Sequence, residues 1–562
     1  MPDALAPLLS RAATWFDRAA AAGWIDAANR ARLDAVEHAT PADLFHEPGS
    51  RPLVVAFFGG TGVGKSSLLN RVAGQALART GVERPTSREV TVYLHEAVRL
   101  AELPTHLPVE RTQVVRHSAA RWRDVAWLDA PDVDSVEQDN RALALAWLAH
   151  VDLVCYVVSP ERYRDDAGWR VLRRRQHRHG WLFVMNRSDE GDPTQADDFA
   201  RILREAGFER PALVSTCCVE PAPDSARDEF NRLVETVDAL RSARGVEALE
   251  RVGLRARLAD LHAALRAAML PLGGDADWQR LDIAAARAAG QAVETILAGT
   301  EYALRGVAAR FATGDSGPLA RLSKTIGGLR TAAPADAPTG HPAVVDAALV
   351  GELWDDWSQA KVAACADAIE IETRKLGLAA APVRRAIEQH AGRVGDEVRS
   401  AVHDGLRAAL ARPGTALTRG LRRVTGFLMA FLPALALLWV AYAAVRGFYA
   451  AAHGGAAFLG GAFAVHSVLL VVIAWAVPWL TDRLLRPSLE AAALRGLRGG
   501  LRVGLDGARD ALLAGVAGAR AEAAELRREC ERLAADVSAA REAPPALDVA
   551  PFVAPASTAA AH

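Results

Sequence analysis

Cysteine is scarce in this sequence, which has five cysteines in 562 residues and no C-x-x-C pair. A disulfide framework uses an even set of paired cysteines, and a zinc ribbon uses two closely spaced pairs, so the sequence favours neither. Few, unpaired cysteines are typical of a reducing compartment. The first 23 residues also lack a basic start followed by an apolar run, and we expect no secretory signal.

An excess of charge of either sign is absent as well. The chain has 66 basic and 67 acidic residues, which gives a formal net charge of -1. This balance excludes a protein that coats nucleic acid through bulk positive charge, and we predict no nucleic-acid partner. Lysine is rare among the basic residues. The four lysines are Lys65, Lys324, Lys361 and Lys375, so the position of each carries more information than that of an arginine.

Two long runs have no charged residue. Residues 424–445 and 447–481 contain no Asp, Glu, Lys or Arg, and Arg446 separates them. A bilayer core of about 30 Å needs roughly 20 apolar helical residues, so we predict a transmembrane helical hairpin at 424–481, with its second span near 461–480. The alternative is a pair of helices buried in a soluble core. The two spans contain His466 but no Asp, Glu, Lys or Arg, which is typical of an anchor rather than an ion pathway.

Seven arginines lie near the two ends of the hairpin. Three precede the first span and four follow the second, whereas the connection between the spans contains one, Arg446. The seven are Arg419, Arg422, Arg423, Arg483, Arg486, Arg495 and Arg498. By the positive-inside rule, both flanks and both termini are expected in the cytoplasm. The predicted location is a membrane, crossed twice.

The rest of the chain divides by its hydrophobic pattern. Short apolar runs alternate with helical patterns from about residue 52 to 240, which predicts an α/β domain with a parallel sheet and flanking helices. From 244 to 423 the strand-like runs stop, and long Ala, Leu and Arg stretches predict an all-α helical bundle.

Glycines recur in the last helical stretch, residues 484–541. Six of them are three, four or eight residues apart: Gly496, Gly500, Gly504, Gly507, Gly515 and Gly518. Each costs about 0.5–1 kcal/mol relative to alanine in a helix. Two interpretations remain open. The glycines allow close packing against another helix or the membrane surface, or a biased composition merely tolerates them.

A phosphate-binding motif follows the first predicted strand. GGTGVGKS at Gly59–Ser66 fits the pattern G-x-x-x-x-G-K-[S/T], between an apolar run and a helical pattern. Glycines let successive backbone amides curve round a phosphate at the positive end of a helix. Lys65 is expected to reach the β- and γ-phosphates, and the Ser66 hydroxyl to coordinate Mg²⁺. The phosphate-binding candidates are Gly59, Gly60, Thr61, Gly62, Val63, Gly64, Lys65, Ser66 and Ser67.

Later strands also end in polar side chains. Asp129 ends VAWLD, where it is expected to hold Mg²⁺ through water, and Ala130 follows where several ATPase classes have a catalytic Glu. Asn186 and Asp189 follow WLFVM. A carboxylate there accepts from guanine N1–H and the 2-amino group, which adenine does not offer. Ser215 ends the next strand, where a backbone N–H is expected to meet the guanine oxygen. The pattern predicts guanine rather than adenine.

Together these residues resemble the Era-like and dynamin-like branches of the P-loop GTPases, over about residues 52–240. The segment KSSLLN (Lys65–Asn70) is typical of that branch. Arg84–Thr91 resembles the switch-one segment, in which a Thr or Ser coordinates Mg²⁺ when GTP is bound. Thr86 and Ser87 are both candidates for this ligand, and the choice between them stays open.

The resemblance extends to the guanine side. Asn186-Arg187-Ser188-Asp189 resembles the N-K-x-D motif, and Ser215-Thr216-Cys217 resembles the looser final motif. The resemblance implies GTP or GDP as the bound nucleotide, with Mg²⁺. The implied base-binding residues are Asn186, Arg187, Asp189, Ser215 and Thr216, and the implied metal ligands are Ser66, Thr86, Ser87 and Asp129.

Two positions depart from the family pattern. The third motif is D-x-x-G, whereas this chain has Asp129-Ala130-Pro131-Asp132, and no glutamine follows. The missing glycine normally offers its N–H to the γ-phosphate. We therefore expect slow intrinsic hydrolysis unless dimerisation or a partner completes the site, and we assign no catalytic residue. Arg187 replaces a lysine whose stem lies along the guanine plane, and an arginine stacks there too.

The order of the parts resembles that of bacterial dynamin-like proteins, in which N-terminal helices pack with the helices after the GTPase domain. The predicted parts are N-terminal helices (1–50), a P-loop GTPase domain (51–243), a helical bundle or stalk (244–423), the transmembrane hairpin (424–481), C-terminal helices (482–541) and a disordered tail (542–562). The resemblance implies a bacterial inner membrane and a homodimer or oligomer formed through the GTPase domain.

Three functions remain open. The first is a GTPase that remodels or tethers membranes. The second is a membrane-anchored, GTP-dependent switch that recruits or regulates a partner. The third, less favoured, is a transport component that uses the hairpin. Lipid-stimulated turnover with assembly favours the first, GTP-dependent capture of one protein favours the second, and the third requires ion flux.

Overall fold

A computed structural model of the chain describes residues 5–47, 51–74, 89–105, 107–131, 138–165, 175–217, 228–311, 353–414, 416–452, 460–485, 488–542 and Phe552. The chain divides into two compact units, Met1–Leu270 with Glu525–His562, and Pro271–Ala524. The tail that we predict to be disordered lies outside the described residues, except for Glu542 and Phe552.

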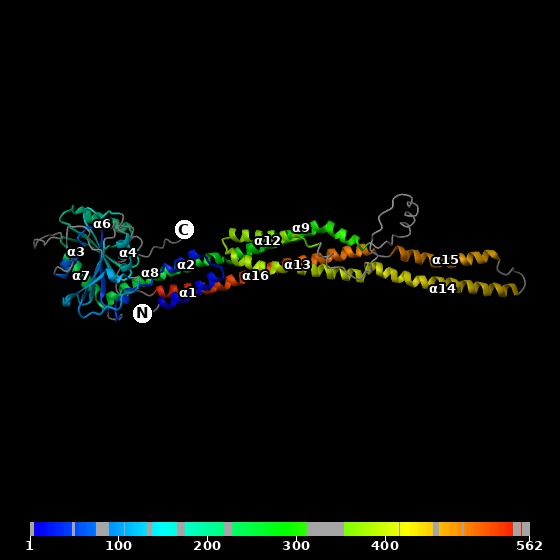
Figure 1. Ribbon diagram of the computed structural model, residues 1–562, viewed down its shortest axis with the longest axis horizontal. Coiled ribbons are helices and arrows are strands. Elements are labelled where there is room, and N and C mark those ends of the chain that lie inside the picture. The colour runs from blue at the N-terminus through cyan, green and yellow to red at the C-terminus, as the bar shows by residue number, and fades with distance from the viewer. Residues whose placement is uncertain are drawn as a thin grey trace. The chain divides into compact units, whose positions relative to one another are not determined.

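The first unit is built round a sheet with helices on both faces (Figure 1). Within the described residues its strands run in the order β3-β2-β4-β1-β5-β6-β7. Every residue of β1, β4, β5 and β6 is buried, as expected for parallel strands covered on both faces. The strands are β1 (Leu53–Gly59), β2 (Val90–His95), β3 (Thr112–His117), β4 (Val125–Asp129), β5 (Leu153–Val158), β6 (Gly180–Asn186) and β7 (Leu213–Thr216).

Alternate residues of β1 enter two hydrophobic cores. Phe58 packs in the core that α4 and α6 cover, and Phe57 packs in the core that α3, α7 and α8 cover. Successive side chains of a strand point to opposite faces, so this one strand contributes to both layers. The helices of this unit are α1 (Leu5–Ala21), α2 (Ala27–Asp34), α3 (Lys65–Ala73), α4 (Gln138–Leu148), α6 (Thr194–Glu205), α7 (Phe230–Leu240) and α8 (Ala243–Met269).

One strand pairing differs from the predicted parallel sheet. β2 pairs antiparallel with β4, while its other pairing, with β3, is parallel. The sheet is therefore parallel over β4-β1-β5-β6-β7 and mixed toward one edge. Strands β2 and β3 have no counterpart among the predicted strands. β3 is a half-exposed edge strand, and its sequence TQVVRH has no continuous apolar run.

A buried ion pair joins the sheet to α8. Arg51 donates through Nη1 to Oδ2 of Asp152 at 2.6 Å and through Nη2 to Oδ1 at 2.7 Å, and it also contacts Glu250 of α8 at 2.7 Å. The Arg51 and Asp152 side chains are each 1% exposed. Loss of either partner would leave an uncompensated buried charge, so the pair fixes α8 against the strand ends.

The N-terminal helix packs on helices that follow the sheet in the sequence. The Trp15 indole of α1 donates to the carbonyl oxygen of Leu526 at 3.0 Å, and Arg11 pairs with Asp536 at 2.8 Å. Both partners belong to the C-terminal part of α16 (Leu489–Arg541). This packing of N-terminal helices with later helices agrees with the expectation from the dynamin-like layout.

The second unit contains most of the helices of the predicted all-α bundle, whereas α8, at the start of the predicted range 244–423, belongs to the first unit. In the second unit these helices are α9 (Asp275–Ala309), α12 (Asp356–Lys375), α13 (Ala380–Ala411) and the part of α16 up to residue 524. Val402 and Leu406 of α13 and Leu497 and Leu501 of α16 are fully buried in a shared core with residues of α9. A continuous apolar stripe on each helix produces this core.

Four of the six glycines in α16 lie where that helix packs closely on α13. A Cβ atom at Gly500 would lie 2.7 Å from Cα of Val402, and one at Gly504 would lie 2.8 Å from Cα of Val398. The other crowded positions are Gly496 and Gly515, whereas Gly507 and Gly518 face open space. Close helix packing therefore explains four of these glycines, and no neighbour among the described residues requires glycine at the other two.

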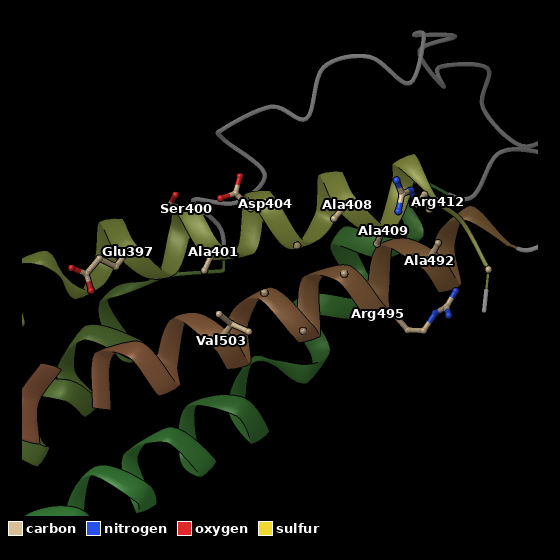
Figure 2. Close-up of a pocket in the computed structure, with 15 residues that line it drawn as sticks. Glu397, Ser400, Ala401, Asp404, Ala408, Ala409, Arg412, Ala492, Arg495 and Val503 are labelled. Atoms are coloured by element: carbon tan, nitrogen blue, oxygen red, sulfur yellow. The ribbon is translucent and has the colours of Figure 1, made fainter. Parts of the chain in front are cut away.

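The same close approach leaves a groove of about 900 Å³ along α13 and α16 (Figure 2). Small residues, among them Ala401, Gly405 and Gly500, line it, and Asp404 and Arg412 are among its charged residues. The groove arises because side chains this small leave the space beside the helix contact unfilled.

Two apolar helices form the predicted hairpin in the second unit. They are α14 (Ala416–Ala452) and α15 (Gly461–Leu484), which pack against each other and are joined at one end by an ion pair between Arg422 and Asp482 at 3.1 Å. Both are long and apolar enough to cross a membrane, and their most apolar windows are only 6% and 11% buried. This exposure disfavours the alternative of two helices buried in a soluble core.

Candidate nucleotide-binding site

The predicted phosphate-binding loop lies between β1 and α3. Gly62 and Gly64 have φ angles of +80° and +88°, which side chains with a Cβ rarely adopt, and Gly64 is the N-terminal cap of α3. Gly59 is needed for another reason, because a Cβ atom there would collide with the carbonyl oxygen of Val157. The strand, turn and helix thus take the form that the motif predicts, with a helix N-terminus facing the loop.

Lys65 folds back over this loop. Its side-chain amine donates to the carbonyl oxygens of Gly60 at 2.9 Å and Gly59 at 3.1 Å, and the residue is 7% exposed. An ammonium group held at the centre of the loop is placed for phosphate oxygens. Thr61, Gly62 and Val63 complete the loop, and Ser67 lies in the first turn of α3.

Ser66 and Asp129 come together at the next position. The Ser66 hydroxyl donates to Oδ2 of Asp129 at 3.0 Å, and Asp129 is buried at the end of β4. Hydroxyl and carboxylate oxygens are ligands that Mg²⁺ accepts, and this ion usually takes one or two protein oxygens together with phosphate oxygens and water. The donor set therefore fits a magnesium ion bound with a nucleotide.

The edge of the sheet contributes neighbours of Asp129 that the sequence did not single out. Antiparallel pairing places Thr91 of β2 opposite Asp129. Burial, with the nearby Asp129 carboxylate, raises the pKa of Tyr93 to about 12, so its hydroxyl stays protonated. The predicted switch-one ligands, Thr86 and Ser87, lie outside the described residues.

Asn186 connects the phosphate loop to β7. Its side-chain amide donates to the carbonyl oxygen of Val63 at 2.9 Å, and its Oδ1 accepts the Thr216 hydroxyl at 2.9 Å. Asn186 and Thr216 are fully buried. These contacts assign both residues to the framework that holds the loop beside the ends of β6 and β7.

Asp189 and Arg187 lie at the surface beyond β6. Arg187 has a left-handed backbone with φ of +55°, and its side chain pairs with Glu190 at 3.6 Å. Asp189 is exposed. The turn is fixed by the Ser188 amide, which donates to the carbonyl oxygen of Thr216 at 3.0 Å. A surface carboxylate in a fixed turn is open to the edge of a base.

Ser215 is held differently from the expectation. Its backbone amide donates to Oε2 of Glu229 at 2.9 Å, and its carbonyl oxygen accepts the Glu229 amide at 2.7 Å. The Ser215 N–H is therefore engaged within the fold rather than directed at a ligand.

Two arginines that the sequence analysis missed contact this site. Arg71 of α3 donates to the carbonyl oxygen of Cys217 at 3.0 Å and pairs with Asp228. These two contacts join α3 to the segment after β7. Arg162, after β5, donates to the carbonyl oxygen of Thr61 in the phosphate loop. Neither belongs to a sequence motif, and among 62 arginines neither stands out.

Residues 54–187 match the family described as "50S ribosome-binding GTPase". This segment contains the phosphate loop, Asp129 and Asn186, and it forms a P-loop GTPase domain. No curated protein sequence matches the chain.

Several solved structures align with this chain. Two belong to a study titled as an oligomerised bacterial dynamin pair for long-range sensing and tethering of membranes. They align with TM-scores of 0.43 and 0.40 at 11% and 10% identity, each over 88% of this chain and 90% of that chain. Toc33 from Arabidopsis thaliana, in complex with Mg²⁺ and GMPPNP, aligns with a TM-score of 0.24 at 15% identity, over 34% of this chain and 85% of that chain.

Proposed function

We propose that this protein binds GTP with Mg²⁺, hydrolyses it slowly, and works as a membrane-anchored GTPase. The observation that carries the proposal is the cluster at the carboxyl end of β1. There the Lys65 amine lies over the glycine loop, and the Ser66 hydroxyl lies 3.0 Å from Asp129. In that arrangement Lys65 and the loop amides would bind phosphate oxygens, while Ser66 and Asp129 would hold the metal directly or through water.

The residue roles that we propose combine this placement with the sequence motifs. We assign the phosphates to Gly59–Ser67, the base to Arg187 and Asp189 with Asn186, Ser215 and Thr216 as support, and the metal to Ser66 and Asp129 with Thr86 or Ser87. The exposed carboxylate of Asp189 supports guanine, because it accepts two donors that adenine lacks.

We further propose that the hairpin anchors the protein in a bacterial inner membrane with both termini in the cytoplasm. Seven flanking arginines against one in the connection support this orientation. We also propose that the chain has the six parts predicted from its sequence, from the N-terminal helices (1–50) to the tail (542–562). In this layout GTP-driven association of GTPase domains would remodel or tether membranes.

One observation favours a second function, a GTP-dependent switch that recruits or regulates a partner. Ala130 and Pro131 follow Asp129, and both are buried, so neither offers a polar side chain to orient an attacking water. A GTPase without such a group turns over slowly until a partner supplies it. Slow turnover suits a switch as well as a remodelling protein.

The test is GTP and ATP turnover by the full chain, with and without liposomes, at several protein concentrations. A remodelling GTPase prefers GTP, and its rate per molecule rises with liposomes and with concentration. A switch prefers GTP at a low rate that neither condition changes, and it captures one protein only when loaded with GTP. Equal use of ATP and GTP would refute the guanine assignment, and absence of any GTP binding would refute the site.

A further inference from the structure

Arg162 lies in a tightly held turn after β5. Its amide and that of Tyr163 both donate to the carbonyl oxygen of Ser159, at 2.9 and 3.0 Å. The Tyr163 ring is buried, and its hydroxyl donates to Asp198 of α6 at 2.9 Å. The position of Arg162 is therefore set by the sheet and by α6, independently of the phosphate loop.

From this turn the Arg162 side chain reaches the phosphate loop. Its Nη1 donates to the carbonyl oxygen of Thr61 at 2.5 Å, and its Nη2 lies 3.0 Å from Oδ2 of Asp165. The carboxylate orients the guanidinium, and the guanidinium makes a charge-assisted bond to a loop carbonyl.

This carbonyl belongs to the peptide that carries the Gly62 N–H. In a planar trans peptide the C=O and N–H point in opposite directions, so a bond that holds the Thr61 oxygen outward turns the Gly62 N–H toward the inside of the loop. Gly62 has φ of +80°, and glycine allows the alternative orientation of this peptide at low energetic cost. The loop sequence alone therefore leaves the orientation of this amide open.

We infer that Arg162 is a positioning residue for phosphate binding, which holds the Gly62 N–H toward the nucleotide through the Thr61 carbonyl. The inference rests on the proposed function. It adds to it a residue from outside the motif that prepares one loop amide before the nucleotide arrives. The positive charge of Arg162 also polarises that peptide, which strengthens its N–H as a donor.

The test compares Arg162→Ala and Arg162→Lys with Arg164→Ala in the full chain. Arg164 is in the same turn, is exposed and pairs with Asp198, so it matches the charge loss without contact to the loop. Loss of one charge-assisted bond predicts about a tenfold weaker affinity for GTP in Arg162→Ala, measured with a fluorescent analogue. Arg162→Lys should recover part of it, and Arg164→Ala should bind like the wild type.

Two further readouts separate positioning from a general structural role. The ratio of GTP to ATP affinity and the thermal midpoint of the nucleotide-free protein should be the same in Arg162→Ala and Arg164→Ala. If Arg162→Ala binds GTP as tightly as Arg164→Ala, or if its midpoint and base preference change together with affinity, the inference is wrong. Failure of the wild type to bind GTP would instead refute the proposed function.

Discussion

At the scale of single residues, Lys65 provides the charged side chain of the phosphate loop. Its amine is nearly buried and is held by two loop carbonyls, which keeps a positive charge where phosphate oxygens would enter. These two bonds hold the amine within the Gly59–Ser66 motif, at the end of β1 and the start of the loop. The residue is therefore expected to matter for binding more than for folding.

Replacing this lysine tests that expectation. Lys65→Ala should abolish measurable GTP binding in a fluorescent-nucleotide titration while the thermal midpoint of the nucleotide-free protein stays close to that of the wild type. Lys375→Ala removes an equal charge from an exposed site paired with Glu372 and serves as the control. Undiminished affinity of Lys65→Ala would contradict the assignment of the loop.

Base choice depends on Asp189. In Asp189→Asn the amide would donate to the carbonyl that xanthine has in place of the 2-amino group of guanine, so preference should move from GTP toward XTP. Competition between the two nucleotides in wild type and variant measures the change. A wild type that binds ATP as tightly as GTP would show that this carboxylate does not select the base.

His179 provides a pH-dependent contribution to stability. Its Nδ1 lies 3.0 Å from the carbonyl oxygen of Val151, and burial lowers its pKa from 6.5 to about 4, with Arg175 and Arg178 nearby acting in the same direction. Between these pH values the unfolded chain takes up a proton that the folded chain does not. The contribution of His179 to the free energy of unfolding is therefore fully present above about pH 6.5 and is lost as the pH falls toward 4.

This loss should amount to about 3 kcal/mol at pH 4. Thermal midpoints measured from pH 7 to pH 4 should fall less steeply for His179→Gln, which keeps a donor but cannot become charged. His38→Gln, at an exposed position in the same unit, should follow the wild type. Parallel profiles for all three proteins would mean that other groups control acid stability.

At the scale of elements, the contact of α13 with α16 depends on glycine at particular positions. Gly500 lies against Val402 and the backbone of Ala401, whereas Gly507, two turns along α16, faces open space. The same substitution should therefore have opposite effects at the two sites, because one adds a methyl group to a tight contact and the other removes backbone freedom from the unfolded chain.

Gly500→Ala should destabilise the protein by about 1–3 kcal/mol through overpacking. Gly507→Ala should stabilise it by about 0.5–1 kcal/mol. Denaturant unfolding followed by circular dichroism compares the two variants directly. Equal effects would show that the close approach of the two helices is not present in solution.

At the scale of the whole molecule, the two apolar helices of the hairpin are the feature that bears on the proposed membrane anchoring. The most apolar windows of α14 and α15 are almost entirely outside the packed core, and an exposed apolar surface of this length is stable only in a membrane or an assembly. The sequence provides the charged residues at the ends of the spans, and the structure adds the ion pair between Arg422 and Asp482.

Deleting residues 424–481 should move the protein from the washed membrane fraction to the soluble fraction. Lys65→Ala, which keeps the hairpin, should remain with the membranes and controls for effects of nucleotide binding on location. Persistence of the deletion variant in the membrane pellet would mean that another part of the chain is an anchor.

The sequence by itself determined the features that depend on neighbouring residues. The phosphate loop, the buried strands with continuous apolar runs and the long apolar helices are local patterns, and each is found where it was predicted. The antiparallel pairing of β2 with β4 was not predictable in this way. The paired residues Thr91 and Asp129 are 38 positions apart, and the direction of pairing depends on how the chain returns to the sheet.

Contacts between distant residues were decided only by the tertiary structure. Arg162 meets Thr61 across 101 positions, Arg71 meets Cys217 across 146, and α13 determines which glycines of α16 are crowded. No local pattern distinguishes these arginines or glycines from their many counterparts. Their roles arise from close packing, which brings together groups whose separation in the sequence carries no information about their separation in space.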